Sequence, residues 1–207
     1  MKVKYPVFFP DATRAVLKTL DSRDIEETKT PGILVNTYHL YKDLGKKVIK
    51  AHGGVKGFMD WKGAVISDSG GFQINTLGSK VTDLLTPEKS IAFQFLLKTD
   101  MVVVLDDFTP PKANQETAEK TVTNTIEWAK RSREEYERQV KKTGHKPLIL
   151  GVVQGGSFQD LRKKCAEELL KIGFDGFGYG GWPISPDGNF DYESAKTIAD
   201  AAPKDYL

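Results

Sequence analysis

The chain contains 207 residues, of which 30 are Lys or Arg and 28 are Asp or Glu, so its formal net charge is +2. Hydrophobic residues make up 39% of the chain, which is typical of a globular domain and excludes an intrinsically disordered protein. The single cysteine, Cys165, excludes a disulfide framework and a cysteine-rich zinc site, and the lack of long apolar runs predicts a cytoplasmic protein with no membrane span.

Five short apolar runs follow one another along the chain, and each ends in a polar or glycine-rich turn. They begin at Ile33, Ala64, Met101, Leu148 and Gly176. Near-continuous apolar runs are typical of parallel strands that are buried on both faces. A strand and its crossover helix together need about 30 residues or more, which these spacings provide. The pattern predicts five strand–helix units, with a sixth strand beginning at Tyr206 and Leu207.

Helical patterns fill the intervals after the third and fourth runs. Apolar residues recur at helical spacing over residues 118–140, and Gly144 ends that pattern. A second apolar stripe includes Cys165, which we expect to be a small buried core residue. We expect Ser157 to cap this second helix and Gly173 to end it.

Two architectures suit alternating strands and helices: an open doubly wound sheet and a (β/α)8 barrel. No glycine-rich dinucleotide fingerprint follows the first run, and in barrels the functional residues gather where the strands end. At these ends the chain carries Asn36, Asp68, Asp106, Gln154 and Gly181. Any one of them could be an ordinary helix cap or turn residue. Five polar or glycine-rich ends on successive strands instead indicate a binding site.

The residue types at these ends suit a purine-like base. An ionised carboxylate accepts two parallel hydrogen bonds, which matches the N1–H and N2–H edge of guanine, and a glutamine amide donates to a carbonyl. Glycine lets a flat ring approach the backbone, and Phe72 offers a stacking surface. A second carboxylate in a separate loop can transfer a proton.

The motifs at the strand ends resemble those of the tRNA-guanine transglycosylase family. The resemblance rests on NTYHL at residues 36–40, SDSGGFQ at 67–73 and GVVQGG at 151–156, and it runs in register from about Pro6 to Leu207. It implies an α/β fold of the (β/α)8 TIM-barrel type. The barrel would be incomplete, with five strand–helix units and the start of a sixth. Residues 1–207 would form a single domain that is truncated at its C-terminal end.

The resemblance also implies a reaction and a role for each matching residue. The family exchanges guanine in a tRNA anticodon loop for a 7-deazaguanine base, preQ1 or queuine, by double displacement. Asp68 matches the general acid/base, Phe72 the stacking aromatic, Asp106 the carboxylate that reads the base edge, and Gln154 and Gly181 the groups that bind the base carbonyl. The other candidate substrate-binding residues are Ser69, Gly70, Gly155 and Trp182.

Two parts of the family machinery are expected beyond residue 207. The resemblance places the nucleophilic aspartate and a cysteine-rich zinc site there, so it implies no cofactor within this chain and no exchange by residues 1–207 alone. The implied partners are tRNA and a 7-deazaguanine base, without a membrane, in a homodimer or heterodimer. Two alternatives stay open: a non-catalytic partner subunit that binds base or tRNA, and a related enzyme that inserts 7-deazaguanine into DNA.

The chain departs from the family pattern at Asp107-Phe108 and at Trp182-Pro183. A bulky Trp182 beside the base pocket would change which 7-deazaguanine is accepted. Alternatively, Trp182 packs on the outer rim and has no effect on the choice of base.

Overall fold

The computed structural model describes residues 6–77, 85–185 and 188–206. The fold is α/β, with a parallel five-stranded sheet in the order β1-β2-β3-β4-β5. The strands are β1 (Gly32–Asn36), β2 (Ala64–Asp68), β3 (Met101–Val103), β4 (Leu148–Val153) and β5 (Gly176–Tyr179). These are the five predicted strands, in sequential order, as in an incomplete TIM-type barrel. The predicted sixth strand begins at Tyr206, which lies in no strand, and Leu207 lies outside the described residues.

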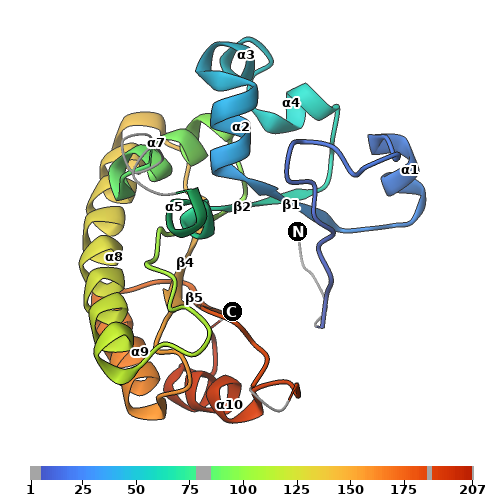
Figure 1. Cartoon of the computed structure of the whole chain (residues 1–207). Coiled ribbons are helices and arrows are strands. Elements are labelled where there is room, and N and C mark those ends of the chain that lie inside the picture. Colours follow the sequence, from blue (N-terminus) through green and yellow to red (C-terminus); the bar gives the residue numbers. More distant parts are fainter. Residues whose placement is uncertain (1–5, 78–84, 186–187, 207) are drawn as a thin grey trace.

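The helices are α1 (Ser22–Glu27), α2 (Thr37–Asp43), α3 (Gly45–Ala51), α4 (Val55–Met59), α5 (Gly71–Leu77), α7 (Pro87–Leu97), α8 (Gln115–Thr143), α9 (Gln159–Ile172) and α10 (Tyr192–Ala201). Helices α2, α7, α8, α9 and α10 follow one another around the outside of the curved sheet, whereas α5 lies inside the arc that they form (Figure 1). Within the described ranges, no helix is both long enough and apolar enough to cross a membrane.

The capping predictions are confirmed at the end of α8 and wrong at the start of α9. Gly144 ends α8 in the left-handed region at φ 71°, as predicted. Ser157 does not cap α9: the N-cap is Phe158, which makes no side-chain capping bond. The chain turns sharply just before this helix, where the amide of Phe158 donates to the carbonyl of Gly155 at 3.1 Å. This turn places the N-cap of α9 one residue past the serine.

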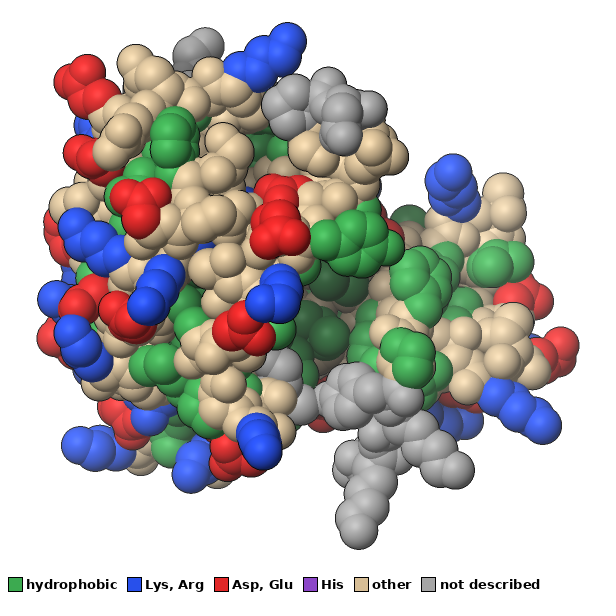
Figure 2. Space-filling model, turned by 90° about the horizontal axis from the view of Figure 1, so that it is seen from below, with side chains coloured by type: hydrophobic (Ala, Val, Ile, Leu, Met, Phe, Trp, Pro, Cys, Tyr) green, Lys and Arg blue, Asp and Glu red, His purple; other side chains and the backbone are tan. Residues whose placement is uncertain are grey.

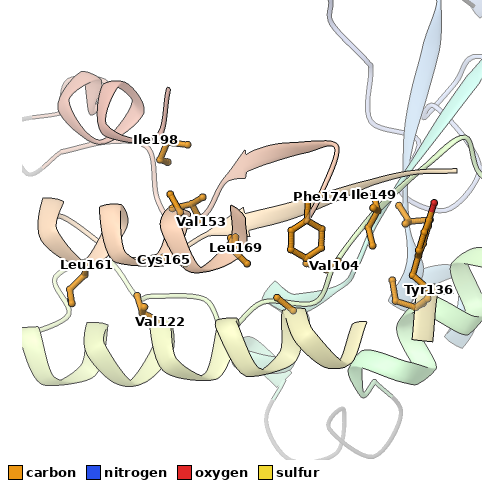
Figure 3. Close-up of a cluster of buried hydrophobic side chains, with 14 of the residues drawn as sticks. Val104, Val122, Tyr136, Ile149, Val153, Leu161, Cys165, Leu169, Phe174 and Ile198 are labelled. Carbon is orange, nitrogen blue, oxygen red and sulfur yellow. The ribbon is translucent and has the colours of Figure 1, made fainter. Parts of the chain in front are cut away.

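The main hydrophobic core lies between the outer face of the sheet and helices α8 and α9 (Figure 3). Val122 of α8, Leu161 of α9 and Val153 of β4 meet in this layer. Cys165 is fully buried there, as predicted for a small core residue. The long amphipathic α8 therefore covers the sheet with its apolar stripe and leaves its charged face in solvent.

The inner face of the sheet is less buried than the continuous apolar runs predicted. Ile33 and Val65 point toward the helices and are fully buried, whereas their neighbours Leu34 and Ile66 are only half-buried. Leu148 at the start of β4 is exposed. On the face shown in Figure 2, hydrophobic side chains gather in the hollow near the centre. Among the described residues, the expected burial on both faces is therefore complete on the outer face, which helices cover, and only partial on the inner face.

Candidate functional site

The first two strand ends are joined by a side-chain hydrogen bond. In the parallel register, Asn36 at the end of β1 lies opposite Asp68 at the end of β2. The Asn36 amide nitrogen donates to Asp68 Oδ2 at 2.6 Å, and its Oδ1 accepts from the backbone N–H of His39 at 3.2 Å. Asn36 thus caps α2 and at the same time fixes the position of the Asp68 carboxyl group.

Asp68 has the electrostatics of a group that can exchange a proton. Removal from water by the surrounding protein raises the pKa of its carboxyl group, while backbone N–H groups of Gly70 and Ser69 and the side chain of Asn36 act in the opposite direction. A carboxyl group with a raised pKa holds a proton closer to neutral pH than an exposed aspartate does, which suits general acid/base chemistry.

The turn after β2 brings the backbone against Asp106. Gly70 lies in the left-handed region at φ 86°, and a Cβ atom on Gly71 would lie only 2.9 Å from both the carbonyl oxygen and Oδ1 of Asp106. Ser69 is buried, and its hydroxyl accepts from the backbone N–H of Gly71 at 3.3 Å. In this structure the Ser69 side chain therefore holds the turn itself.

Asp106 and Gln154 form the centre of the site. The Gln154 amide nitrogen donates to Asp106 Oδ2 at 2.6 Å, and Gln154 Oε1 accepts from the backbone N–H of Thr109 at 3.1 Å. Gln154 is completely buried. Removal from water raises the pKa of Asp106 to about 7, against the hydrogen bond from Gln154, and the nearby charges of Asp68 and Asp107 raise it further.

Gly181 lies beside the buried glutamine. Its backbone is in the left-handed region at φ 89°, and a Cβ atom there would lie 3.5 Å from Gln154 Oε1 and 3.7 Å from the carbonyl oxygen of Thr109. Gly155 directly follows Gln154 in the sequence and has a positive φ of 147°. The structure thus brings the turns after β3, β4 and β5 together around one amide side chain.

The two aromatic candidates are both exposed. The Phe72 ring is 50% exposed, and its edge-to-face neighbour is Phe108, with ring centroids 5.3 Å apart. Trp182 is 57% exposed and lines a pocket of about 350 Å³ together with Thr109 and Gly156, among others. Asp68, Asp106 and Gln154 are not among the described residues that line this pocket. Trp182 therefore stands next to the carboxylate site, in a neighbouring hollow.

Thr109 and Arg162 were not among the sequence candidates, and Asn36 was predicted only as a polar strand end, without a role of its own. Asn36 was visible as the last residue of the first apolar run, and the parallel register then places it opposite Asp68. The signal for Arg162 was a lone arginine beside Leu161, at the edge of an apolar helical stripe. Its side chain is fully buried.

The described residues do not fit a zinc site. No group of three His, Cys, Asp or Glu side chains among them is placed to hold a metal ion. Burial raises the pKa of the Cys165 thiol to about 12, so this sulfur stays protonated and is a poor metal ligand.

Comparison with known proteins gives a consistent set of relatives. A family model described as "Queuine tRNA-ribosyltransferase" matches residues 1–206. Curated proteins named queuine tRNA-ribosyltransferase are similar to the chain: 34% identical in Thermoanaerobacter pseudethanolicus and 36% in Thermotoga neapolitana, each over 98% of this chain. A third, from Acinetobacter baylyi, is 38% identical over 88% of the chain. The matches cover 57%, 58% and 50% of these relatives, so the chain spans about half of their length.

Proposed function

This chain belongs to the queuine tRNA-ribosyltransferase family, and we propose from that premise that it forms the base-binding part of a tRNA-guanine transglycosylase. The proposed reaction exchanges guanine in a tRNA anticodon loop for a 7-deazaguanine base, by double displacement, in the cytoplasm. The observation that carries the proposal is the hydrogen bond between half-buried Asp106 and fully buried Gln154, beside Gly181.

The pair offers the complement of a guanine edge. When ionised, the Asp106 carboxylate accepts from the N1–H and N2–H groups of the base. Gln154 holds Asp106 with one N–H of its amide group, and the second N–H and the backbone N–H of Gly181 are the donors we assign to the base carbonyl. Phe72, half exposed at the start of α5, supplies a surface on which the ring stacks.

Asp68 is the proposed general acid/base. Its raised pKa lets it carry a proton at a pH where an exposed aspartate has lost it, and the bond from Asn36 fixes its orientation. The base must leave the anticodon stack to reach such a site, as in enzymes that extrude a nucleotide. The nucleophile and the zinc site are expected in the part of the family pattern beyond residue 207. Assembly of the protein into a homodimer or heterodimer also stays a prediction.

Calorimetric titration of the chain with 7-deazaguanine tests the base-binding role. We expect 7-deazaadenine to bind at least about tenfold more weakly, because it lacks the carbonyl and the N1–H that the site is built to pair, and unpaired buried polar groups are costly. Equal binding of the two bases, or no binding of 7-deazaguanine, would overturn the proposal.

Incorporation of labelled guanine into nucleic acid tests the reaction. The assay uses a protein in which residues 1–207 are joined to the part of the family pattern that carries the nucleophile and the zinc site. We expect label in tRNA and none in DNA. Asp68→Asn should abolish turnover while tRNA binding is retained, because the amide cannot transfer the proton. Label in DNA instead of tRNA, or normal turnover by Asp68→Asn, would contradict the proposed reaction or the proposed role.

A further inference from the structure

Arg162 is a buried cation whose hydrogen bonds all go to backbone carbonyls at the edge of the site. It lies in the first turn of α9 and is only 1% exposed. Its Nε donates to the carbonyl oxygen of Gly156 at 2.8 Å, and its Nη1 donates to those of Val153 and Gly180, both at 3.1 Å. Among the described residues, no carboxylate forms an ion pair with it.

The three carbonyl groups lie at the end of β4 and in the turns after β4 and β5, next to the proposed carbonyl-binding residues. Val153 directly precedes Gln154, and Gly180 directly precedes Gly181. In a planar trans peptide the C=O and N–H groups point in opposite directions. Because Arg162 holds the carbonyl of Gly180, the N–H of Gly181 is directed away from the guanidinium group.

The surroundings of Arg162 keep it in this position. The guanidinium carbon lies 4.2 Å from the centre of the Tyr179 ring, and the Tyr179 hydroxyl donates to Asp191 Oδ2 at 3.1 Å. A Cβ atom on Gly155 would lie 2.7 Å from the backbone nitrogen of Arg162, so the turn after β4 is pressed against α9. A side chain that only filled space here would be apolar, since burying a charge without a carboxylate is unfavourable.

We propose that Arg162 is a positioning residue for base recognition. By joining the turns after β4 and β5, it directs the Gly181 N–H and the Gln154 amide at one point, where the carbonyl of the base would lie. It thereby sets the preference of the site for a base with a carbonyl group. This inference rests on the proposed function, because it assumes that the base is bound between these two turns.

Two ligands isolate the carbonyl contacts: 7-deazaguanine and its 6-thio analogue. Both keep the N1–H and N2–H edge that Asp106 reads, and only the carbonyl oxygen is replaced by sulfur, a weak acceptor. We expect the wild-type chain to prefer the oxo base by about tenfold, from one to two hydrogen bonds. In Arg162→Met this preference should fall to about twofold or less, while the 6-thio base binds with nearly unchanged affinity.

Two further variants separate positioning from stability. Arg131→Met also removes an arginine that links structural elements, the one paired with Glu88 between α8 and α7, but it should leave the preference unchanged. In Arg162→Lys a buried charge is kept, but one nitrogen replaces the planar fork that reaches three carbonyls. We expect Arg162→Lys to lose the preference as well, since charge alone does not position the turns.

The outcomes are distinct. If the wild-type chain binds 7-deazaguanine but folded Arg162 variants keep the full oxo preference, the positioning role is wrong and the proposed function stands. If the wild-type chain binds neither base, the proposed function is wrong and this inference falls with it. If neither Arg162 variant folds, Tyr179→Leu removes the ring beside the guanidinium while leaving the arginine in place. An unchanged preference in that variant, or its failure to fold, would overturn the inference.

Discussion

Replacement of Asp106 by asparagine should make the folded chain more stable at high pH while it weakens base binding. The carboxyl group of Asp106 has a pKa of about 7 in the folded chain, compared with 3.8 for an ordinary aspartate. A raised folded-state pKa means that the contribution of this group to stability is complete below about pH 4 and is lost as the pH rises to about 7. Asparagine resembles the protonated carboxyl group and does not titrate, so Asp106→Asn lacks this loss.

The size of the effect follows from the pKa of Asp106. At about 1.4 kcal/mol per pH unit, the wild-type chain should lose about 3 kcal/mol relative to Asp106→Asn between pH 5 and pH 8. Urea unfolding of both chains at the two pH values measures this difference. Asp160→Asn, at an exposed position on α9, is the matched control for the change in net charge. At the same time, Asp106→Asn should bind 7-deazaguanine at least about tenfold more weakly, because it loses an acceptor of two hydrogen bonds.

Destabilisation of Asp106→Asn by the same amount at pH 5 and pH 8 would refute this reasoning. It would mean that Asp106 is ionised across the whole range and that the hydrogen bond from Gln154 outweighs the removal of the carboxyl group from water. Unchanged base binding would refute the separate assignment of Asp106 to the base edge.

Two further predictions concern a glycine at the site and an ion pair away from it. Gly71→Ala should weaken 7-deazaguanine binding by roughly tenfold in calorimetry, because the new Cβ would lie 2.9 Å from Asp106 Oδ1 and must displace it. The control is Gly178→Ala, whose Cβ would meet atoms only at 3.8 Å. Equal effects of the two substitutions on binding would contradict the argument. The hydrogen bond from Arg131 lowers the pKa of Glu88 to about 2, so the stabilisation from this pair is present above about pH 4.5 and is lost as the pH falls toward 2. Glu88→Gln should therefore lower the free energy of unfolding in urea by about 1 kcal/mol at pH 7, a value that allows for the partial exposure of the pair. The free energies of the wild-type and variant chains should become equal near pH 2. A constant difference between them from pH 7 to pH 2 would contradict the role of the ion pair.

The strands and the strand-end residues could be predicted because both follow from local pattern and topology. Strands such as β4 carry nearly continuous apolar residues, and parallel strands place all their carboxyl ends at one edge of the sheet. That is enough to bring Asp68, Asp106 and Gln154 to the same rim without any knowledge of distances. Their roles in the reaction came from the family resemblance and stay predictions.

The contacts between turns could not be read from the sequence. The bond from Gln154 to Asp106 joins residues 48 positions apart, and the one from Arg162 to Gly180 depends on how closely the ends of β4 and β5 approach. An arginine beside an apolar stripe is equally consistent with an exposed helix edge. The start of α9 was misplaced for a similar reason, since the turn at Gly155 decides it and the local capping pattern around Ser157 does not.

The parallel register of β1 and β2 has a consequence for the acidity of the site. Asn36 donates to Asp68 only because the two strands pair residue for residue from Gly32 and Ala64 onward. Since side chains alternate between faces, one residue inserted in β1 would turn Asn36 away from the rim. The pKa of Asp68 would then rise further, because the bond from Asn36 lowers it. The number of residues in a strand thus helps to set the pH at which a carboxyl group on the neighbouring strand releases its proton.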